Sequence, residues 1–160
     1  MKLSVVFLAA AIGSAMSIAN AQSTLDNLPS KGSAISIVAP TGGGLLVGGS
    51  DDCLTADVIS GVGSWAYDQT SATDSPYGQS ESICYFYTGL PGVYNDVWYD
   101  WTATFTGLVQ VDTCGSTSDT KIAAYPGAGC PVTGTALDCN DDSCGLQSLI
   151  QFPVTSGQTY

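Results

Sequence analysis

Hydrophobic and polar residues alternate with a period of two along the second half of the chain. In the stretch VWYDW (97–101), the apolar side chains share one face of an extended segment and Asp100 takes the other. The same alternation recurs several times, and each instance predicts a half-buried β-strand. The predicted strands are residues 97–101, 108–112, 121–125 and 149–154, with earlier ones near 55–60 and 64–67 and a short one at 135–139.

Turn-forming dipeptides separate these segments, as at Thr106-Gly107 and Pro126-Gly127. Short strands at a spacing of roughly ten residues, joined by Gly-rich turns, are typical of an antiparallel β-sandwich. No window shows a sustained helical period, so we expect an all-β domain over residues 51–160. The segment 157–160 resembles a turn and the start of another strand, and natural domains usually cover an open sheet edge. We therefore expect this domain to be incomplete at its C-terminus.

The first 21 residues have a different pattern. Lys2 precedes an apolar run that extends to about Ile18, and a small-x-small motif follows at 19–21, which predicts a secretory signal peptide over 1–21, cleaved after Ala21. A membrane anchor is the alternative, but a spanning helix needs about 20 apolar residues. We expect a secreted or cell-surface protein with no membrane insertion after cleavage. Residues 22–50, rich in Gly, Ser and Pro, form a linker or a first strand.

The chain is strongly acidic. It holds 14 Asp and Glu against three Lys and Arg, a net charge of −11, and loss of Lys2 with the signal peptide leaves 2 − 14 = −12. Nucleic acid is excluded as a partner because phosphate binding needs clustered cations. Glu81 is the only glutamate. Asp is the acid of turns and calcium loops, so the negative charge is placed in loops.

Six cysteines in an exported chain predict three disulfides. A zinc site is the alternative, but the chain has no His and no C-x-x-C pair. The strand order favours three pairings: Cys53 with Cys84, Cys130 with Cys139, and Cys114 with Cys144. A bond between Cys139 and Cys144 would instead close the loop LDCNDDSCG (137–145) into its own ring.

Acidic loops converge at one end of the predicted sandwich, because consecutive strands run in opposite directions. The residues placed at this end are Asn95, Asp96, Asp119, Asn140, Asp141 and Asp142. Calcium takes oxygen ligands from carboxylates, amides and carbonyls, and it accepts them from separate loops. The same carboxylates without a cation would repel one another by about 1 kcal/mol per close pair at a water-like dielectric. Two interpretations follow, a calcium site or a set of solvated Asx turns.

Catalysis by a Ser-His-Asp or Cys-His arrangement is excluded, because the chain lacks His. A glycosidase with paired carboxylates stays as a formal alternative. Aromatic side chains offer surface for sugars or extended peptides, unless Trp65 and Trp98 belong to the core. The aromatic residues considered are Trp65, Tyr67, Tyr77, Tyr85, Phe86, Tyr87, Tyr94 and Trp98.

Two longer segments carry a family resemblance. NDVWYDWTATFTGLVQVDTCGSTSDTKIAAY (95–125) and CNDDSCGLQSLIQFPVTSGQTY (139–160), with Asp51-Asp52-Cys53 before them, resemble the cysteine-bearing variant of the bacterial pre-peptidase C-terminal domain family. The resemblance covers residues 51–160. It implies a jelly-roll-like β-sandwich that serves secreted or surface proteins in export, stability or substrate attachment.

Related collagen-binding modules of clostridial collagenases bind calcium, largely through an N-terminal linker whose ligands do not match this sequence residue by residue. From these features we expect a non-catalytic extracellular module for adhesion or attachment to a protein or polysaccharide polymer, with calcium as its cofactor. A structural spacer of a larger secreted protein is the alternative, and a fragment of a secreted hydrolase is a further one.

Overall fold

The computed structural model describes residues 3–8, 14–20, 48–78, 81–84 and 92–160, and in its first two strands it describes the side chains of Met16 and Ile18 only. The described residues are almost entirely strands and loops, with two short 3-10 turns, η2 (Cys53–Thr55) and η3 (Ser82–Cys84). No helix among them is long and apolar enough to cross a bilayer. The strands are β1 (Leu3–Leu8), β2 (Ser14–Asn20), β3 (Asp57–Ser60), β4 (Gly63–Tyr67), β5 (Asp96–Thr102), β6 (Gly107–Asp112), β7 (Asp119–Ala124), β8 (Asp138–Asn140) and β9 (Leu149–Val154).

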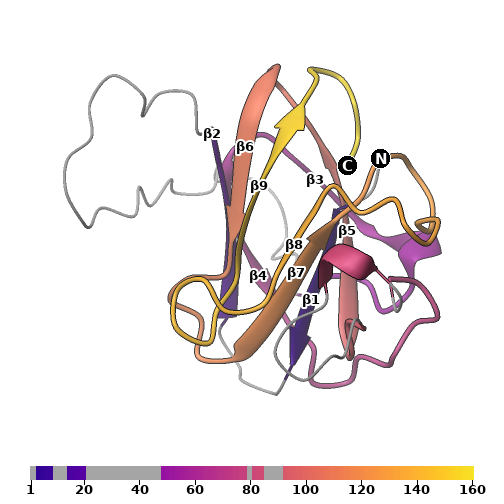
Figure 1. Ribbon diagram of the computed structural model, residues 1–160, viewed down its shortest axis with the longest axis vertical. Coiled ribbons are helices and arrows are strands. Elements are labelled where there is room, and N and C mark those ends of the chain that lie inside the picture. The colour runs from indigo at the N-terminus through magenta and orange to yellow at the C-terminus, as the bar shows by residue number, and fades with distance from the viewer. Residues whose placement is uncertain (1–2, 9–13, 21–47, 79–80, 85–91) are drawn as a thin grey trace.

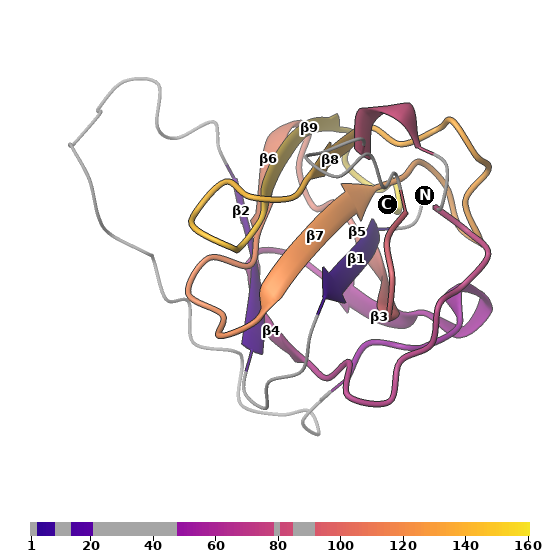
Figure 2. The same ribbon diagram turned by 60° about the horizontal axis from the view of Figure 1, so that its bottom comes forward.

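The strands form two sheets that face each other (Figures 1 and 2). One has the order β3-β5-β1-β7-β8 and the other the order β4-β2-β6-β9. The predicted all-β, disulfide-linked sandwich is confirmed. One pair departs from the antiparallel expectation, because β3 runs parallel to β5, with Asp57 opposite Tyr99. A parallel pair needs a long connection between its strands, and the segment between β3 and β5 includes β4.

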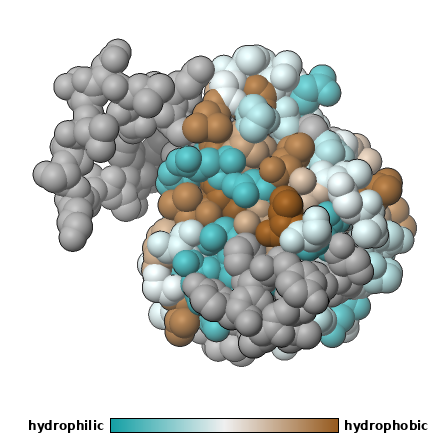
Figure 3. All heavy atoms as spheres, viewed as in Figure 1, coloured by the Kyte–Doolittle hydropathy of each residue, from teal (hydrophilic) through white to brown (hydrophobic). Residues whose placement is uncertain are grey.

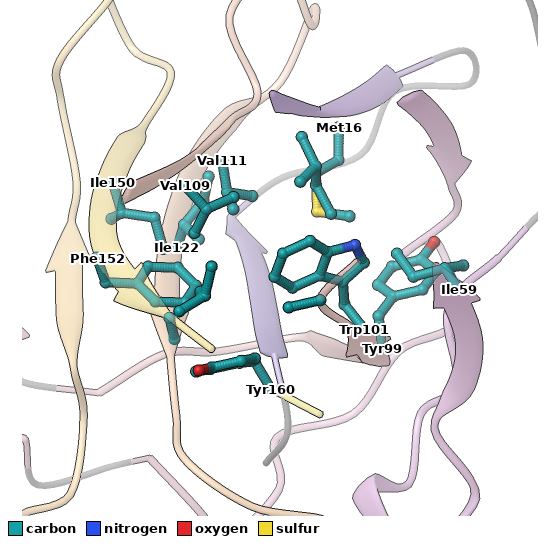
Figure 4. Packing of buried hydrophobic residues seen from close by; sticks show 14 of the residues in the cluster. Met16, Ile59, Tyr99, Trp101, Val109, Val111, Ile122, Ile150, Phe152 and Tyr160 are labelled. Carbon is teal, nitrogen blue, oxygen red and sulfur yellow. The ribbon is translucent and has the colours of Figure 1, made fainter. Parts of the chain in front are cut away.

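The main core lies between the two sheets and follows the period-two pattern of the sequence (Figure 4). Tyr99 and Trp101 of β5 are 1% and 0% exposed and pack with residues of both sheets. Burying such side chains stabilises the fold by about 1.5–3 kcal/mol each. Their polar atoms are satisfied: Trp101 Nε1 donates to the Gly61 carbonyl at 2.7 Å, and the Tyr99 hydroxyl donates to the Ala66 carbonyl at 3.0 Å.

A second cluster covers the outer face of the five-stranded sheet. Trp98 and Tyr125 lie in it, with ring centroids 6.4 Å apart, together with Ala123 and the cysteines 53, 84 and 139. The cysteines form the disulfides Cys53–Cys130, Cys84–Cys139 and Cys114–Cys144.

The predicted pairings Cys53–Cys84 and Cys130–Cys139 are therefore wrong, and so is the alternative ring between Cys139 and Cys144. The loop with Cys130 turns back to η2, while η3 sits against β8 and pairs Cys84 with Cys139. Three disulfides indicate that the chain folds in an oxidising, extracellular type of environment.

The N-terminal residues occupy both sheets. Leu3–Leu8 pairs with β5 and β7, and Ser14–Asn20 pairs with β4 and β6. These are the residues for which a signal peptide is predicted, so the structure is that of the unprocessed chain and cleavage after Ala21 stays a prediction. Residues 22–47 of the predicted linker lie outside the described residues.

Candidate cation site

Three carboxylates meet at the end of the β7–β8 pair. Asp119 is the first residue of β7, and Asp141 and Asp142 follow the last residue of β8. The two strands are antiparallel, with Ile122 opposite Asn140, so the start of β7 lies beside the end of β8. One carboxylate oxygen from each of the three aspartates lies within 4.8 Å of the others. The predicted convergence of Asp119 with Asp141 is confirmed.

The local electrostatics make this arrangement costly without a counter-charge. Burial, and next the charge of Asp142, raise the pKa of Asp119. Burial also raises the pKa of Asp141, although the nearby Lys121 opposes that effect. Lys121 is only 8% exposed, and its own pKa is lowered by burial. Among the described residues, the ammonium group of Lys121 is thus the one positive charge set against the three carboxylates, which leaves the cluster net negative.

Buried hydroxyl groups hold the two sides of the cluster in place. Thr113, Thr120 and Ser148 are fully buried. The hydroxyls of Thr113 and Thr120 lie 2.6 Å apart, and the Ser148 N–H donates to both, at 3.0 and 3.1 Å. The Ser148 hydroxyl in turn donates to the main-chain carbonyl of Asp141. The network thus ties the residue after Asp119 to the backbone of Asp141.

A disulfide closes the same end. Cys114–Cys144 joins the β6–β7 loop to the loop after β8, and this pairing was predicted. Gln147 braces the loop further, because its carbonyl accepts from the N–H groups of Ser143 and Cys144 at 2.9 and 3.0 Å. Its side-chain amide donates to the Ser118 carbonyl at 3.1 Å. The aspartates therefore sit on a cross-linked frame.

Asn140 has a structural role at this end, and its predicted role as a ligand stays a prediction. Its side-chain oxygen accepts from the N–H of Leu149 at 3.1 Å and so joins β8 to the start of β9. Sequence reasoning assigned Asn140 to the same end correctly. The described contacts make it part of the frame that positions Asp141.

Asn95 and Asp96 lie at the same end of the sheet but outside the cluster. Along one row, Asp96 of β5 is opposite Val6 of β1, which is opposite Lys121 of β7, so a whole strand separates Asp96 from β7. Its carboxylate accepts from the Ser75 N–H at 2.8 Å, and burial raises its pKa. The Asn95 N–H donates to Asp74 at 2.8 Å. These residues therefore fix the loop before β5. They stay apart from the cluster because β1 fills the position between β5 and β7.

A second acidic group, Asp52 with Cys53 and Cys130, also has its ligand atoms close together. Both cysteines are consumed by their mutual disulfide. Asp52 accepts from the Leu54 N–H at 2.9 Å as the cap of η2. This group therefore stabilises the turn η2, and its cysteines offer no thiolate to a metal.

Among the described residues, three of the aromatic side chains considered from the sequence lie in or against the core and not on the surface. Trp98 is 1% exposed and Tyr67 2% exposed, and Trp65 packs against the core, so the alternative of a core role holds. Tyr77 is 36% exposed, and residues 85–87 lie outside the described residues. On the face in Figure 3, hydrophobic residues are interleaved with hydrophilic ones.

No family model, curated protein or solved structure matches this chain. The resemblance to the pre-peptidase C-terminal domain family therefore stays a prediction from the motifs alone. Three hard oxygen donors, raised carboxylate pKa values and a braced frame suit a hard divalent cation, and calcium prefers carboxylate oxygens of this kind.

Proposed function

We propose that this chain is a non-catalytic module of an exported protein, that it attaches its parent to an extracellular polymer, and that a calcium ion stabilises its acidic end. The observation that carries the cation part is the meeting of Asp119, Asp141 and Asp142 within 4.8 Å. A divalent ion would neutralise three carboxylates that otherwise repel one another, and burial raises the pKa of two of them, Asp119 and Asp141.

The attachment part rests on sequence. The chain has no His for the common nucleophilic mechanisms, and its motif order resembles that of accessory modules. Three disulfides suit a protein that works outside the cell. The alternative, a spacer in a larger surface protein, is favoured by the same cross-linked frame, which would resist proteolysis without any ligand.

Thermal unfolding of the full chain with calcium, with magnesium and with a chelator tests the cation part. A ligand that binds only the folded state adds about 2.7 kcal/mol at a concentration one hundred times its Kd. We expect the melting temperature to rise with calcium and to fall back with chelator. Equal midpoints in calcium and chelator would contradict a calcium site.

Co-sedimentation of the full chain with insoluble collagen, chitin and cellulose tests the attachment part. We expect retention on at least one of these polymers above the level of an inert control protein. Retention on none of them, with full resistance to protease, would favour the spacer.

A further inference from the structure

The two N-terminal strands fill one position in each sheet. β1 lies between β5 and β7, and β2 lies between β4 and β6, with Met16 and Ile18 in the core. Without them, no described strand would pair with the facing edges of β7, β4 and β6, and β5 would keep only the C-terminal residues Thr159 and Tyr160 on that edge. Both sheets would then expose unpaired backbone N–H and C=O groups next to an opened core.

The C-terminal residues enter the position of β1. Tyr160 and Trp101 exchange both backbone hydrogen bonds, at 2.8 and 2.7 Å, and Thr159 is opposite Thr102 in an antiparallel bridge. β1 is also antiparallel to β5, with Leu3 opposite Tyr99. The C-terminal segment 159–160 and β1 therefore run in the same direction along β5. One residue position, the one opposite Asp100, separates Tyr160 from Leu3.

The hydrogen bonds place both segments on the same edge of β5. Trp98 exchanges backbone bonds with Ser50, at 2.8 and 3.2 Å, although Ser4 of β1 is also opposite Trp98. Ser50 therefore lies on the edge away from β1. Successive residues of a strand direct their N–H and C=O groups to alternate edges, so those of Trp101, three residues later, point to the edge of β1. Figures 1 and 2 both show β1 beginning beside the end of the chain.

We propose that the β1 and β2 positions form an acceptor site for a pair of extended strands that enters in line with Tyr160, and that residues 3–20 fill this site in the unprocessed chain. The proposal rests on the predicted removal of the signal peptide and is independent of the cation site. Entry in line with Tyr160 favours polypeptide joined covalently to that residue over a separate chain.

The chemistry of the occupant follows from its neighbours. It needs a strand of about six residues against β5 and β7, a short connection, and a strand of about seven residues that directs apolar side chains inward at alternate positions, as Met16 and Ile18 do. Residues 3–20 contain no charged residue, so an uncharged segment fits both positions.

Occupation by the signal peptide and its cleavage exclude each other. Ala19 and Asn20 pair with Gln110 and Val109 of β6, so the segment just before the predicted cleavage point is held in a sheet. Cleavage requires this strand to be unpaired. Once it has taken place, both positions are free for the true occupant.

A rearranged chain tests the proposal. Residues 3–20 are moved from the N-terminus to follow Tyr160, through a spacer of one threonine, and the rest of the chain begins at Gln22. The control carries two threonines, which shifts the register by one residue and turns each side chain of the moved strand to the opposite face. The full chain and residues 22–160 alone are measured beside them, all in chelator so that bound calcium plays no part.

We expect the one-threonine form to contain the same three disulfides as the full chain and to melt within a few degrees of it. The two-threonine form and residues 22–160 alone should melt lower by about 10 °C or more. Equal melting of the two spacer forms would overturn the in-line register. Two results would overturn the acceptor site itself. One is that residues 22–160 alone melt at the same temperature as the full chain. The other is that the one-threonine form fails to fold although the full chain folds.

Discussion

Asp119 at the start of β7 and Asp141 just after β8 bring carboxylate oxygens to within 4.8 Å of each other. The register of the two strands causes this approach, because one step from the pair Ile122–Asn140 leads to Lys121 opposite Asp141. Lys121 lies among acids that outnumber it, so a further positive charge at this end would be stabilising.

Substitutions in the cluster should weaken calcium binding. Asp119→Asn and Asp141→Asn each remove one negative charge and keep the shape of the side chain. We expect each to lower the affinity by about tenfold or more, which corresponds to about 1.4 kcal/mol. Isothermal titration calorimetry of the full chain measures this change. Asp57→Asn, on β3 and outside the cluster, is the control and should leave the affinity unchanged. An equal loss in all three variants would point to a general charge effect.

The metal-free protein should become more stable as the pH is lowered from 7 towards 4. Burial raises the pKa of Asp119 and Asp141 above 3.8, so the folded state holds these protons more tightly than the unfolded chain. This stabilisation is fully present below the unfolded pKa and is lost as the pH rises through the higher folded-state pKa.

Melting temperatures in chelator across this pH range measure the effect. Asp96 and Asp112 also have raised pKa values, so the informative comparison is between the wild type and Asp119→Asn. The melting temperature of Asp119→Asn should rise less than that of the wild type as the pH is lowered. Saturating calcium should reduce the rise, because protons then compete with the cation. Identical profiles for the wild type and the variant would contradict the assignment.

The disulfide Cys114–Cys144 should matter for binding as well as for stability. Replacing both cysteines with alanine removes the bond between the two loops of the acidic end. We expect a loss of about 2–4 kcal/mol in the free energy of unfolding, together with weaker calcium binding. The matched control, Cys53→Ala with Cys130→Ala, should cost a similar free energy and leave calcium affinity unchanged. Calorimetry and denaturant unfolding on both pairs provide the comparison, and equal effects on affinity would show that the first bond has no special role.

Asp96→Asn should leave calcium affinity unchanged. Asp96 was predicted as a ligand, but β1 separates it from the cluster, and burial raises the pKa of its carboxyl group. Asn keeps an oxygen for the Ser75 N–H and removes the buried charge, so the melting temperature at pH 7 should not fall. Titration calorimetry beside Asp119→Asn decides the point. If Asp96→Asn lowered the calcium affinity as much as Asp119→Asn does, Asp96 would be a ligand of the cation after all.

Period-two alternation predicted β5, β6, β7 and β9 from sequence because each has one face in the core. The convergence of Asp119 with Asp141 followed from the alternating direction of these strands. Two of the three disulfide pairings did not follow from the sequence, because Cys53, Cys84 and Cys130 lie in turns or irregular loops, whose paths no periodicity records.

The two N-terminal strands could not be predicted either, because the continuous apolar run that marks a signal peptide has no alternation. The hydroxyl network was missed for a different reason. Thr113, Thr120 and Ser148 are small polar residues next to turns, where such residues usually face solvent. Their burial depends on the packing of three segments that are distant in sequence.

That network supplies a further prediction at Thr120. Thr120→Val keeps the shape of the side chain but removes the hydroxyl that contacts Thr113 and accepts from the Ser148 N–H. Leaving buried polar groups with fewer partners costs about 1–3 kcal/mol. Thr120→Ser keeps the hydroxyl and should cost less, and Thr133→Val, on an exposed loop, should change stability by no more than about 0.5 kcal/mol.

Denaturant unfolding measures these costs, and calorimetry on the same variants measures calcium affinity. Because the Ser148 hydroxyl donates to the Asp141 carbonyl, Thr120→Val should weaken calcium binding while Thr133→Val should not. If Thr120→Val lowers stability and leaves affinity intact, the network supports the fold alone and the position of Asp141 is set by the Cys114–Cys144 bond and the Gln147 contacts.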